Sequence, residues 1–205
     1  RVYVADISVM SDITGFHIHR GVLAAVHRPT AAQKKQSVSS LIAKLQGKTN
    51  IALLIAEGIT NVDNMGALFR NAAAFGVDGL VFDHRCCDPL YRKAIRVSMG
   101  HAFSLPWAIA NNWTLDLALL KKELGLQLIG CETGHLALPM WEVEATDRFA
   151  LIMGEEKSGL SPSTMELCDV IAEIPMTPNV PSVNVGVASA VGLYEFLGRN
   201  GFNNR

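Results

Sequence analysis

The chain has 205 residues, 49% of them apolar, and a formal net charge of −1 at pH 7. This length and composition suffice for one domain with a full hydrophobic core plus an appendage, and the near-neutral charge excludes a general polyanion binder. The charges are uneven, because the His, Arg and Lys residues of the first quarter are offset only by Asp6 and Asp12. That basic stretch fits either an ordinary solvated face or a surface that touches a phosphate backbone.

Cysteine and histidine spacing predicts neither a disulfide framework nor a metal site. The four cysteines contain no CxxC pair, which favours reduced thiols in a cytosolic protein. His84, beside Cys86 and Cys87, has no second ligand pair at the spacing that zinc requires, and the same holds for His17 and His19. No apolar run approaches the roughly twenty residues of a membrane span, and no signal peptide is visible. We therefore expect a cytoplasmic protein without metal or membrane contacts.

The first fifty residues predict an appendage and a linker. Residues 1–28 contain two β-like runs, 2–4 and 21–26, and are expected to be the remnant of a small β-rich module. Residues 29–50 open with a proline and are rich in Gln, Lys and Ser, which predicts a linker carrying a helix around 37–46. Because the chain starts at Arg1 and not at Met, we expect a fragment that lacks an N-terminal region.

From residue 51 onward, short apolar runs alternate with helical patterns. Continuous apolar runs of the kind that form strands buried on both faces occur at 51–56, 79–82, 126–131, 149–153 and 170–174. Helices are expected at 64–75, from Asp88-Pro89 onward, at 114–124 with Thr114 as cap, from Ser161-Pro162 onward, and at 184–197. This alternation predicts an α/β fold with a parallel sheet covered by helices on both faces.

The last predicted helix, 184–197, is apolar almost all around and contains Gly186 and Gly192. A helix that is apolar on every side is buried on every side. Each interior glycine costs roughly 1 kcal/mol relative to alanine, a cost that close backbone approach would justify. The pattern favours a homodimer interface over a simple core helix.

Three turn-rich loops follow predicted strands, at 130–134, 154–159 and 175–182. In open α/β sheets the ligand sits beyond the carboxyl ends of the strands, where such loops meet. The dinucleotide fingerprint GxGxxG, the phosphate loop GxxxxGK[ST] and the GxSxG elbow are all absent. The sequence therefore argues against a nicotinamide enzyme, an ATPase and a serine hydrolase.

A set of polar residues on these loops and helix starts is rich in hydrogen-bond donors and contains one fixed cation: Asn64, Arg70, Glu156, Ser182 and Asn184. Such a set suits binding a phosphate or steadying a developing oxyanion. Four residues to either side of Arg70 stand Gly66 and Ala74, so the arginine has no carboxylate partner at that spacing on its own helix.

Three ordered motifs resemble those of the SpoU (TrmH-like) branch of the SPOUT trefoil-knot RNA methyltransferases. Asn64-x-Gly66-Ala67-x-x-Arg70-x-Ala72 resembles the first motif, and Gly154-x-Glu156-x-x-Gly159-Leu160 resembles the second. Ile174-Pro175-Met176, followed by Ser182-x-Asn184-Val185 and Leu193-Tyr194-Glu195, resembles the third. The resemblance covers about residues 50–198, and 17–26 is similar to the end of the small RNA-binding module that often precedes this domain.

The resemblance implies a methyltransferase domain at 51–205, a C-terminal trefoil knot, and S-adenosylmethionine as methyl donor. Residues carried over to the donor pocket are Thr133, Gly134, Gly154, Ile174, Met176 and Val183. The implied reaction methylates a ribose 2′-hydroxyl of tRNA or rRNA, in a homodimer that buries the last helix. The alternative is a catalytically silent knot domain that serves as an RNA-binding or scaffold module.

We expect Arg70 to stabilise the developing alkoxide electrostatically, because guanidinium resists deprotonation. Ser182 and Asn184 would orient the ribose, and Asn64 and Glu156 would hold the arginine. The third motif departs from the family pattern at Thr177-Pro178, where glycine is usual two residues after the methionine, and also at Val183 and Gly186. Pro178 and Pro181 stiffen this loop and remove two N–H donors.

Overall fold

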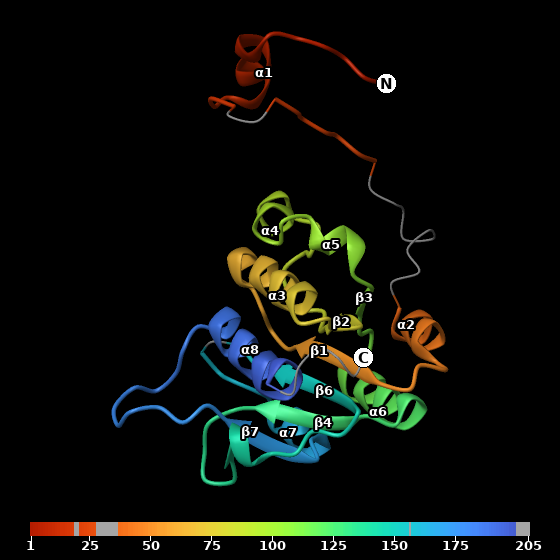
Figure 1. The fold of residues 1–205 in the computed structure, drawn as a ribbon, viewed down its shortest axis with the longest axis vertical. Coiled ribbons are helices and arrows are strands. Elements are labelled where there is room, and N and C mark those ends of the chain that lie inside the picture. Colours follow the sequence, from red (N-terminus) through yellow and green to blue (C-terminus); the bar gives the residue numbers. More distant parts are fainter. Residues whose placement is uncertain (19–20, 28–36, 156, 200–205) are drawn as a thin grey trace. The chain divides into compact units, whose positions relative to one another are not determined.

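The computed structural model describes residues 1–18, 21–27, 37–155 and 157–199. By its contacts the chain forms two compact units, Arg1–Lys34 and Lys35–Arg205. The helices of the described residues, labelled in Figure 1, are α1 (Ile7–Thr14), α2 (Val38–Leu45), α3 (Val62–Ala74), α4 (Arg92–Val97), α5 (His101–Ser104), α6 (Trp113–Leu124), α7 (Pro162–Leu167) and α8 (Val185–Leu193). Two short helical turns add to them, η1 (Met140–Glu142, 3-10) and η2 (Tyr194–Gly198, π).

The first unit does not contain the predicted strands. Residues 2–4 and 21–26 are irregular, and the regular element among residues 1–18 and 21–27 is the helix α1. Val2 and Val4 are 94% and 98% exposed. A β-like run forms a strand only when a neighbouring strand takes up its backbone hydrogen bonds, and these described stretches offer none. The assignment of 1–28 to an RNA-binding module stays a prediction.

The second unit is built on a seven-stranded sheet in the order β3-β2-β1-β6-β4-β7-β5, and every pairing is parallel. Its strands are β1 (Ile51–Ala56), β2 (Gly79–Phe82), β3 (Trp107–Ile109), β4 (Gln127–Cys131), β5 (Leu138–Pro139), β6 (Arg148–Met153) and β7 (Val170–Glu173). The predicted α/β architecture is confirmed. The trefoil knot stays a prediction that the family resemblance implies.

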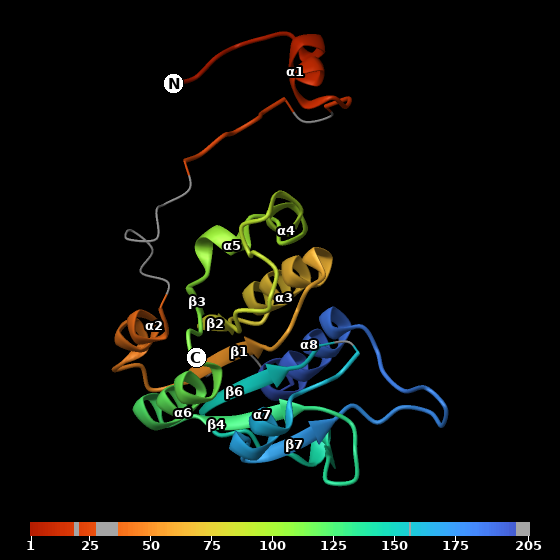
Figure 2. The same ribbon diagram turned by 180° about the vertical axis from the view of Figure 1, so that it is seen from behind.

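Helices cover both faces of the sheet, as the ribbon shows from two sides (Figures 1 and 2). Along β1, Ala52, Leu54 and Ala56 pack in one cluster with α3 and α8, whereas Ile51, Leu53 and Ile55 pack in the other with α2 and α6. All six are fully buried. This two-sided burial explains why the strand is apolar at every position and not at every second one.

Helix α2 confirms the helix predicted around 37–46. Ser37 caps it by accepting a hydrogen bond from the Ser40 N–H at 3.2 Å. Its inner side chains Val38, Leu41 and Leu45 belong to the cluster that covers β1. The predicted linker therefore ends in a helix that is part of the second unit, while 28–36 lies outside the described residues.

Two helix starts differ from the prediction. Asp88-Pro89 does not begin a helix, because the Asp88 carboxylate accepts a hydrogen bond from the Leu90 N–H at 3.0 Å and closes a turn; α4 begins at Arg92. Helix α6 is capped by Asn112, which accepts from Leu115, and not by Thr114. Short polar side chains accept backbone hydrogen bonds both in turns and at helix N-caps. The residue type alone therefore does not show which of the two a position forms.

The last helix is buried on one side only in the single chain. Asn71 of α3 donates to the Gly186 carbonyl (2.6 Å) and to Ser189 Oγ (2.9 Å), which ties α8 to α3. The opposite side is open: Val187, Val191 and Tyr194 are 53%, 42% and 56% exposed. Burial on every side, as predicted from the sequence, would therefore need a second molecule.

Candidate active site

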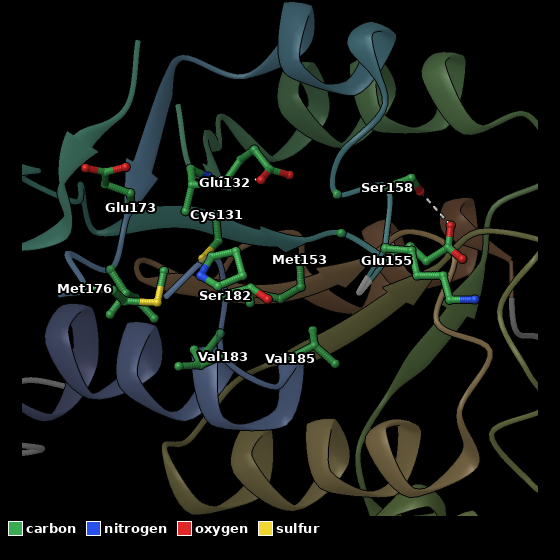
Figure 3. A pocket seen from close by; sticks show the side chains of 17 residues that line it. Cys131, Glu132, Met153, Glu155, Ser158, Glu173, Met176, Ser182, Val183 and Val185 are labelled. Atoms are coloured by element: carbon green, nitrogen blue, oxygen red, sulfur yellow. Dashed lines mark hydrogen bonds between the residues drawn. The ribbon is translucent and has the colours of Figure 1, made fainter. Parts of the chain in front are cut away.

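A cavity of about 450 Å³ opens at the carboxyl ends of β4, β6 and β7 (Figure 3). Its volume lies within the range of small-molecule sites. Three segments line it: 131–133 at the end of β4, parts of 153–159 at the end of β6, and parts of 173–188. The predicted residues that line it are Thr133, Gly154, Ile174, Met176, Ser182 and Val183. The cavity thus lies where the three turn-rich loops were expected to meet.

Gly154 makes this geometry possible. The chain leaves β6 there and folds back, so that Gly159 N–H donates to the Glu155 carbonyl at 2.9 Å. A Cβ at Gly154 would lie 2.3 Å from the Gly159 carbonyl carbon and 2.5 Å from the Leu160 nitrogen. Both neighbours are backbone atoms, which cannot rotate away as a side chain can. Only glycine fits at this position.

Glu132, which the sequence analysis missed, holds this loop in place. Its Oε2 accepts a hydrogen bond from the Leu160 N–H at 2.8 Å, and its Oε1 accepts from the Thr133 N–H at 3.0 Å. The carboxylate fills the space beside Gly159, where a Cβ would lie 1.9 Å from Oε2. The available signal was its place within the loop 130–134, directly after a strand.

The cavity combines carboxylates with apolar and sulfur-containing side chains. Glu132, Glu155 and Glu173 line it, and Ser158 Oγ donates to Glu155 Oε2 at 2.6 Å (Figure 3). Burial, with a smaller effect of the Glu132 charge, raises the pKa of the Cys131 thiol to about 12, so this thiol stays protonated and is not a nucleophile. Lys157 also lines the cavity, but the three carboxylates outnumber it, so the lining suits a ligand that has both a cationic group and an apolar body.

An ion network of two buried carboxylates and the half-exposed Arg85 supports the loop from the neighbouring strand ends. Arg85 donates to Glu57 Oε1 (2.9 Å) and to Asp83 Oδ2 (2.6 Å), and both carboxylates are almost fully buried. Burial alone would raise the pKa of Asp83, but hydrogen bonds from Gly58, Cys86 and Arg85, together with the Arg85 charge, outweigh it and lower this pKa.

The second oxygen of Glu57 reaches the start of α7. Glu57 Oε2 accepts from Thr164 Oγ1 at 2.7 Å and from the Ser161 N–H at 3.2 Å. Thr164 in turn accepts from the indole N–H of Trp113 at 2.7 Å. The loop that lines the cavity is therefore held at its far end through the buried Glu57.

The first and third motifs meet beside the cavity. Asn184 Nδ2 donates to Asn64 Oδ1 at 2.9 Å, while Asn184 Oδ1 caps α8 by accepting from the Gly186 N–H at 2.8 Å. Neither asparagine is among the residues that line the cavity, and the same is true of Gly134. One hydrogen bond of Asn64 thus runs to Asn184, which fixes where α8 begins.

Arg70 lies on α3 with an exposed side chain and is not among the described residues that line the cavity. The single chain therefore does not gather the predicted catalytic residues around one cavity. Ser182 lines the cavity, and Asn64 and Asn184 lie beside it. Arg70 projects from α3. Glu156 lies outside the described residues. The catalytic roles of these five residues stay predictions.

Within 1–18, 21–27, 37–155 and 157–199, no three His, Cys, Asp or Glu side chains gather where they could hold a metal ion. The helices in the same ranges are all too short or too polar to span a membrane.

Together, the parallel sheet and a cavity walled by three strand-end loops define an α/β protein with a ligand site at the carboxyl edge of its sheet. A model of the SpoU rRNA Methylase family matches residues 52–194. The chain belongs to this family, which agrees with the resemblance read from its three motifs.

Proteins named as RNA methyltransferases are similar to this chain in sequence. An uncharacterized tRNA/rRNA methyltransferase of Mycobacterium tuberculosis is 40% identical over 196 residues, covering 94% of this chain and 65% of the relative. The 23S rRNA (guanosine-2′-O-)-methyltransferase RlmB of Escherichia coli is 32% identical over 178 residues, covering 87% and 71%. This chain thus spans about two thirds of the length of the mycobacterial relative.

Solved structures are also similar. The SpoU methyltransferase AviRb of Streptomyces viridochromogenes, in complex with AdoMet, superposes with a TM-score of 0.69 at 26% identity, covering 77% of this chain and 64% of that one. An RNA 2′-O ribose methyltransferase superposes with a TM-score of 0.67 at 29% identity, covering 75% and 58%.

Proposed function

We propose that this protein transfers a methyl group from S-adenosylmethionine to a ribose 2′-hydroxyl of tRNA or rRNA. The observation that carries the proposal is the cavity at the ends of β4, β6 and β7 in a chain of the SpoU family. The RlmB relatives methylate a guanosine 2′-oxygen of 23S rRNA by name, and AviRb was solved with AdoMet. Both support the proposal.

The chemistry of the cavity fits this cofactor. Met153, Met176 and Val183 offer an apolar surface to an adenine ring, while nearby carboxylates suit the positive charge of a sulfonium. Gly154 and Ile174 directly follow β6 and β7 and line the cavity, so their backbone groups would hold the cofactor, together with Thr133 and Gly134 of the adjoining loop. When bound, the cofactor would supply an electrophilic methyl group.

The residues of this chain would position and activate the acceptor. Ser182, which lines the cavity, and Asn184 would orient the ribose. Arg70 would hold the phosphate or stabilise the negative charge that develops on the 2′-oxygen, since a guanidinium stays protonated. Asn64 and Glu156 would support this arrangement. Holding the acceptor in line with the methyl group can lower the barrier by roughly 7–11 kcal/mol in favourable intramolecular cases.

The assembly proposed is a cytoplasmic homodimer formed through α8. The exposed side chains Val187 and Val191 of α8 and Tyr194 at the start of η2 form an apolar strip. Burying such a strip against a second copy removes apolar surface from water, at about 25 cal/mol per Å². The four cysteines, all free thiols, agree with a reducing compartment.

The test is Arg70→Ala, with donor binding and methyl incorporation measured separately. RNA from cells lacking the gene is incubated with methyl-labelled S-adenosylmethionine, and Lys122→Ala on α6 serves as the control. Donor affinity should be unchanged while incorporation falls roughly 100- to 1,000-fold, the usual effect of removing one oxyanion-stabilising donor. Incorporation within a few-fold of the parent would disprove the role of Arg70. A parent protein that binds RNA yet transfers no label would instead indicate a silent RNA-binding module.

A further inference from the structure

Helices α4 and α5 carry a surface without acidic residues. Between Asp88 and Asp116 the sequence contains no Asp or Glu, while α4 contributes Arg92, Lys93 and Arg96. All three cations are exposed. Lys93 pairs with Asp63 of α3 at 2.6 Å, and this exposed pair contributes little net attraction. The net charge of this surface favours a polyanionic partner.

Large apolar side chains are exposed at the start of α4, in the turn after it and on α5. Tyr91, Met99 and Phe103 are 51%, 61% and 66% exposed. The inward positions of these helices, such as Ala94 and Ala102, are fully or almost fully buried, so the outward direction of the large residues is a property of the fold. Exposed aromatic rings among cations match the requirements of unpaired nucleotides, whose bases stack on rings while their phosphates pair with Arg and Lys.

The turn between α4 and α5 fixes how this surface is presented. Met99 has φ 56° although it is not glycine, and Gly100 follows with φ 85°. The Gly100 N–H donates to the Ile95 carbonyl at 3.0 Å, and the buried Ser98 hydroxyl donates to the same carbonyl at 2.9 Å. A left-handed methionine persists only where its surroundings hold it. These contacts fix the turn, from which the Met99 side chain projects into solvent with 61% of its surface exposed.

The surface continues to the predicted catalytic cation. Helix α4 lies directly on Gly66 of α3, where a Cβ would be 2.5 Å from Val97 Cβ. Arg70 stands four residues after Gly66 and therefore on the same side of α3, one turn further along. Arg70 is exposed on this side of α3, so an RNA strand bound to α4 would have access to it.

We propose that Tyr91, Arg92, Lys93, Arg96, Met99 and Phe103, here named the α4–α5 surface, form the docking site for unpaired RNA next to the methylated nucleotide. Arg92 and Arg96 contact phosphates, and Tyr91 and Phe103 stack on bases. The inference rests on the proposed function, and it assigns the RNA contact to the methyltransferase domain itself and not only to an appended module.

The experiment uses a fluorescein-labelled RNA hairpin with an unpaired loop, titrated with the full chain at several salt concentrations. Tyr91→Ala/Phe103→Ala should weaken binding at least about 30-fold at every salt concentration, because two stacked bases each lose roughly 1–3 kcal/mol. Arg92→Ala should lower the slope of log K against log salt by about 0.7–0.9. Tyr91→Phe/Phe103→Tyr, which keeps both rings, should bind like the parent. The matched control is Leu115→Ala/Lys122→Ala on α6, where Leu115 is 66% exposed.

The outcomes separate this inference from the proposed function. Affinity for S-adenosylmethionine, measured by calorimetry, should be the same in all variants, and in turnover assays KM for RNA should rise while kcat at saturating RNA holds. RNA affinities of the alanine variants within twofold of the α6 control overturn the docking site, as does binding to anionic lipid vesicles in preference to RNA. If the parent protein methylates no RNA, the methyltransferase proposal is disproved. If the Tyr91→Ala/Phe103→Ala variant nevertheless binds RNA more weakly than that parent, the docking site stands.

Discussion

Glu132→Ala tests whether one carboxylate holds the wall of the cavity. The side chain accepts from Leu160 N–H at 2.8 Å and from Thr133 N–H at 3.0 Å, and Leu160 is only 3% exposed. Removing the acceptor leaves a buried N–H unpaired, at a cost of roughly 1–3 kcal/mol in the free energy of unfolding. If the loop opens locally to hydrate that group, the closed fraction falls. Apparent affinity for the proposed donor then falls by at most about 5- to 150-fold.

The assay combines urea unfolding, followed by circular dichroism, with calorimetric titration of S-adenosylmethionine. Glu132→Gln keeps one amide oxygen that can accept from Leu160, so it should recover part of both losses. Glu123→Ala, an exposed glutamate on α6, is the control and should behave like the parent. The reasoning is refuted if Glu132→Ala matches that control in urea midpoint and in donor affinity. A loss of stability alone, with donor affinity intact, would show that the carboxylate supports the fold but not the cavity.

Three further changes probe other parts of the chain. Thr164→Val leaves Glu57 and the Trp113 indole each short of a partner, at roughly 1–3 kcal/mol apiece, so urea unfolding should show at least about 2 kcal/mol of destabilisation. Asp83 has a folded pKa below its ordinary value of 3.8, so its stabilisation is present above that value and is lost as pH falls through the folded pKa. Asp83→Asn should therefore be less stable than the parent at pH 7, and the difference in urea midpoint should shrink below about pH 4; a constant difference would contradict this. Val187→Asp places a charge in the proposed dimer strip and should yield monomers by light scattering, whereas the same change at an exposed leucine of α6 should not.

The strands of the second unit were predictable because burial on both faces leaves a continuous apolar run. β1 and β2 begin and end where the sequence placed them, and β4, β6 and β7 differ by one residue. β3 and β5 escaped prediction because three and two residues are too few to make a pattern. In the first unit the same kind of run was misleading, since a strand depends on a partner that the local sequence does not contain.

The location of the site could be predicted from the sequence, but the hydrogen bonds that support it could not. Glycine-rich loops after parallel strands located the cavity, because the carboxyl ends of such strands lie at one edge. Thr164 and Glu57, however, stand 107 residues apart, and no local pattern links them. The surroundings of Arg70 depend on which side of α3 is covered by α4 at Gly66, and this is a tertiary contact that no local sequence pattern encodes.

The cavity draws on segments that leave the ribosome at different times. Its third wall, 173–188, trails the loop that ends at 159 by about 1–6 s at roughly 5–20 residues per second. During that interval a growing chain has two walls and nothing to close them. A small molecule can therefore occupy the complete cavity only after this last wall has been synthesised, so its binding cannot guide the folding of the segments that precede it.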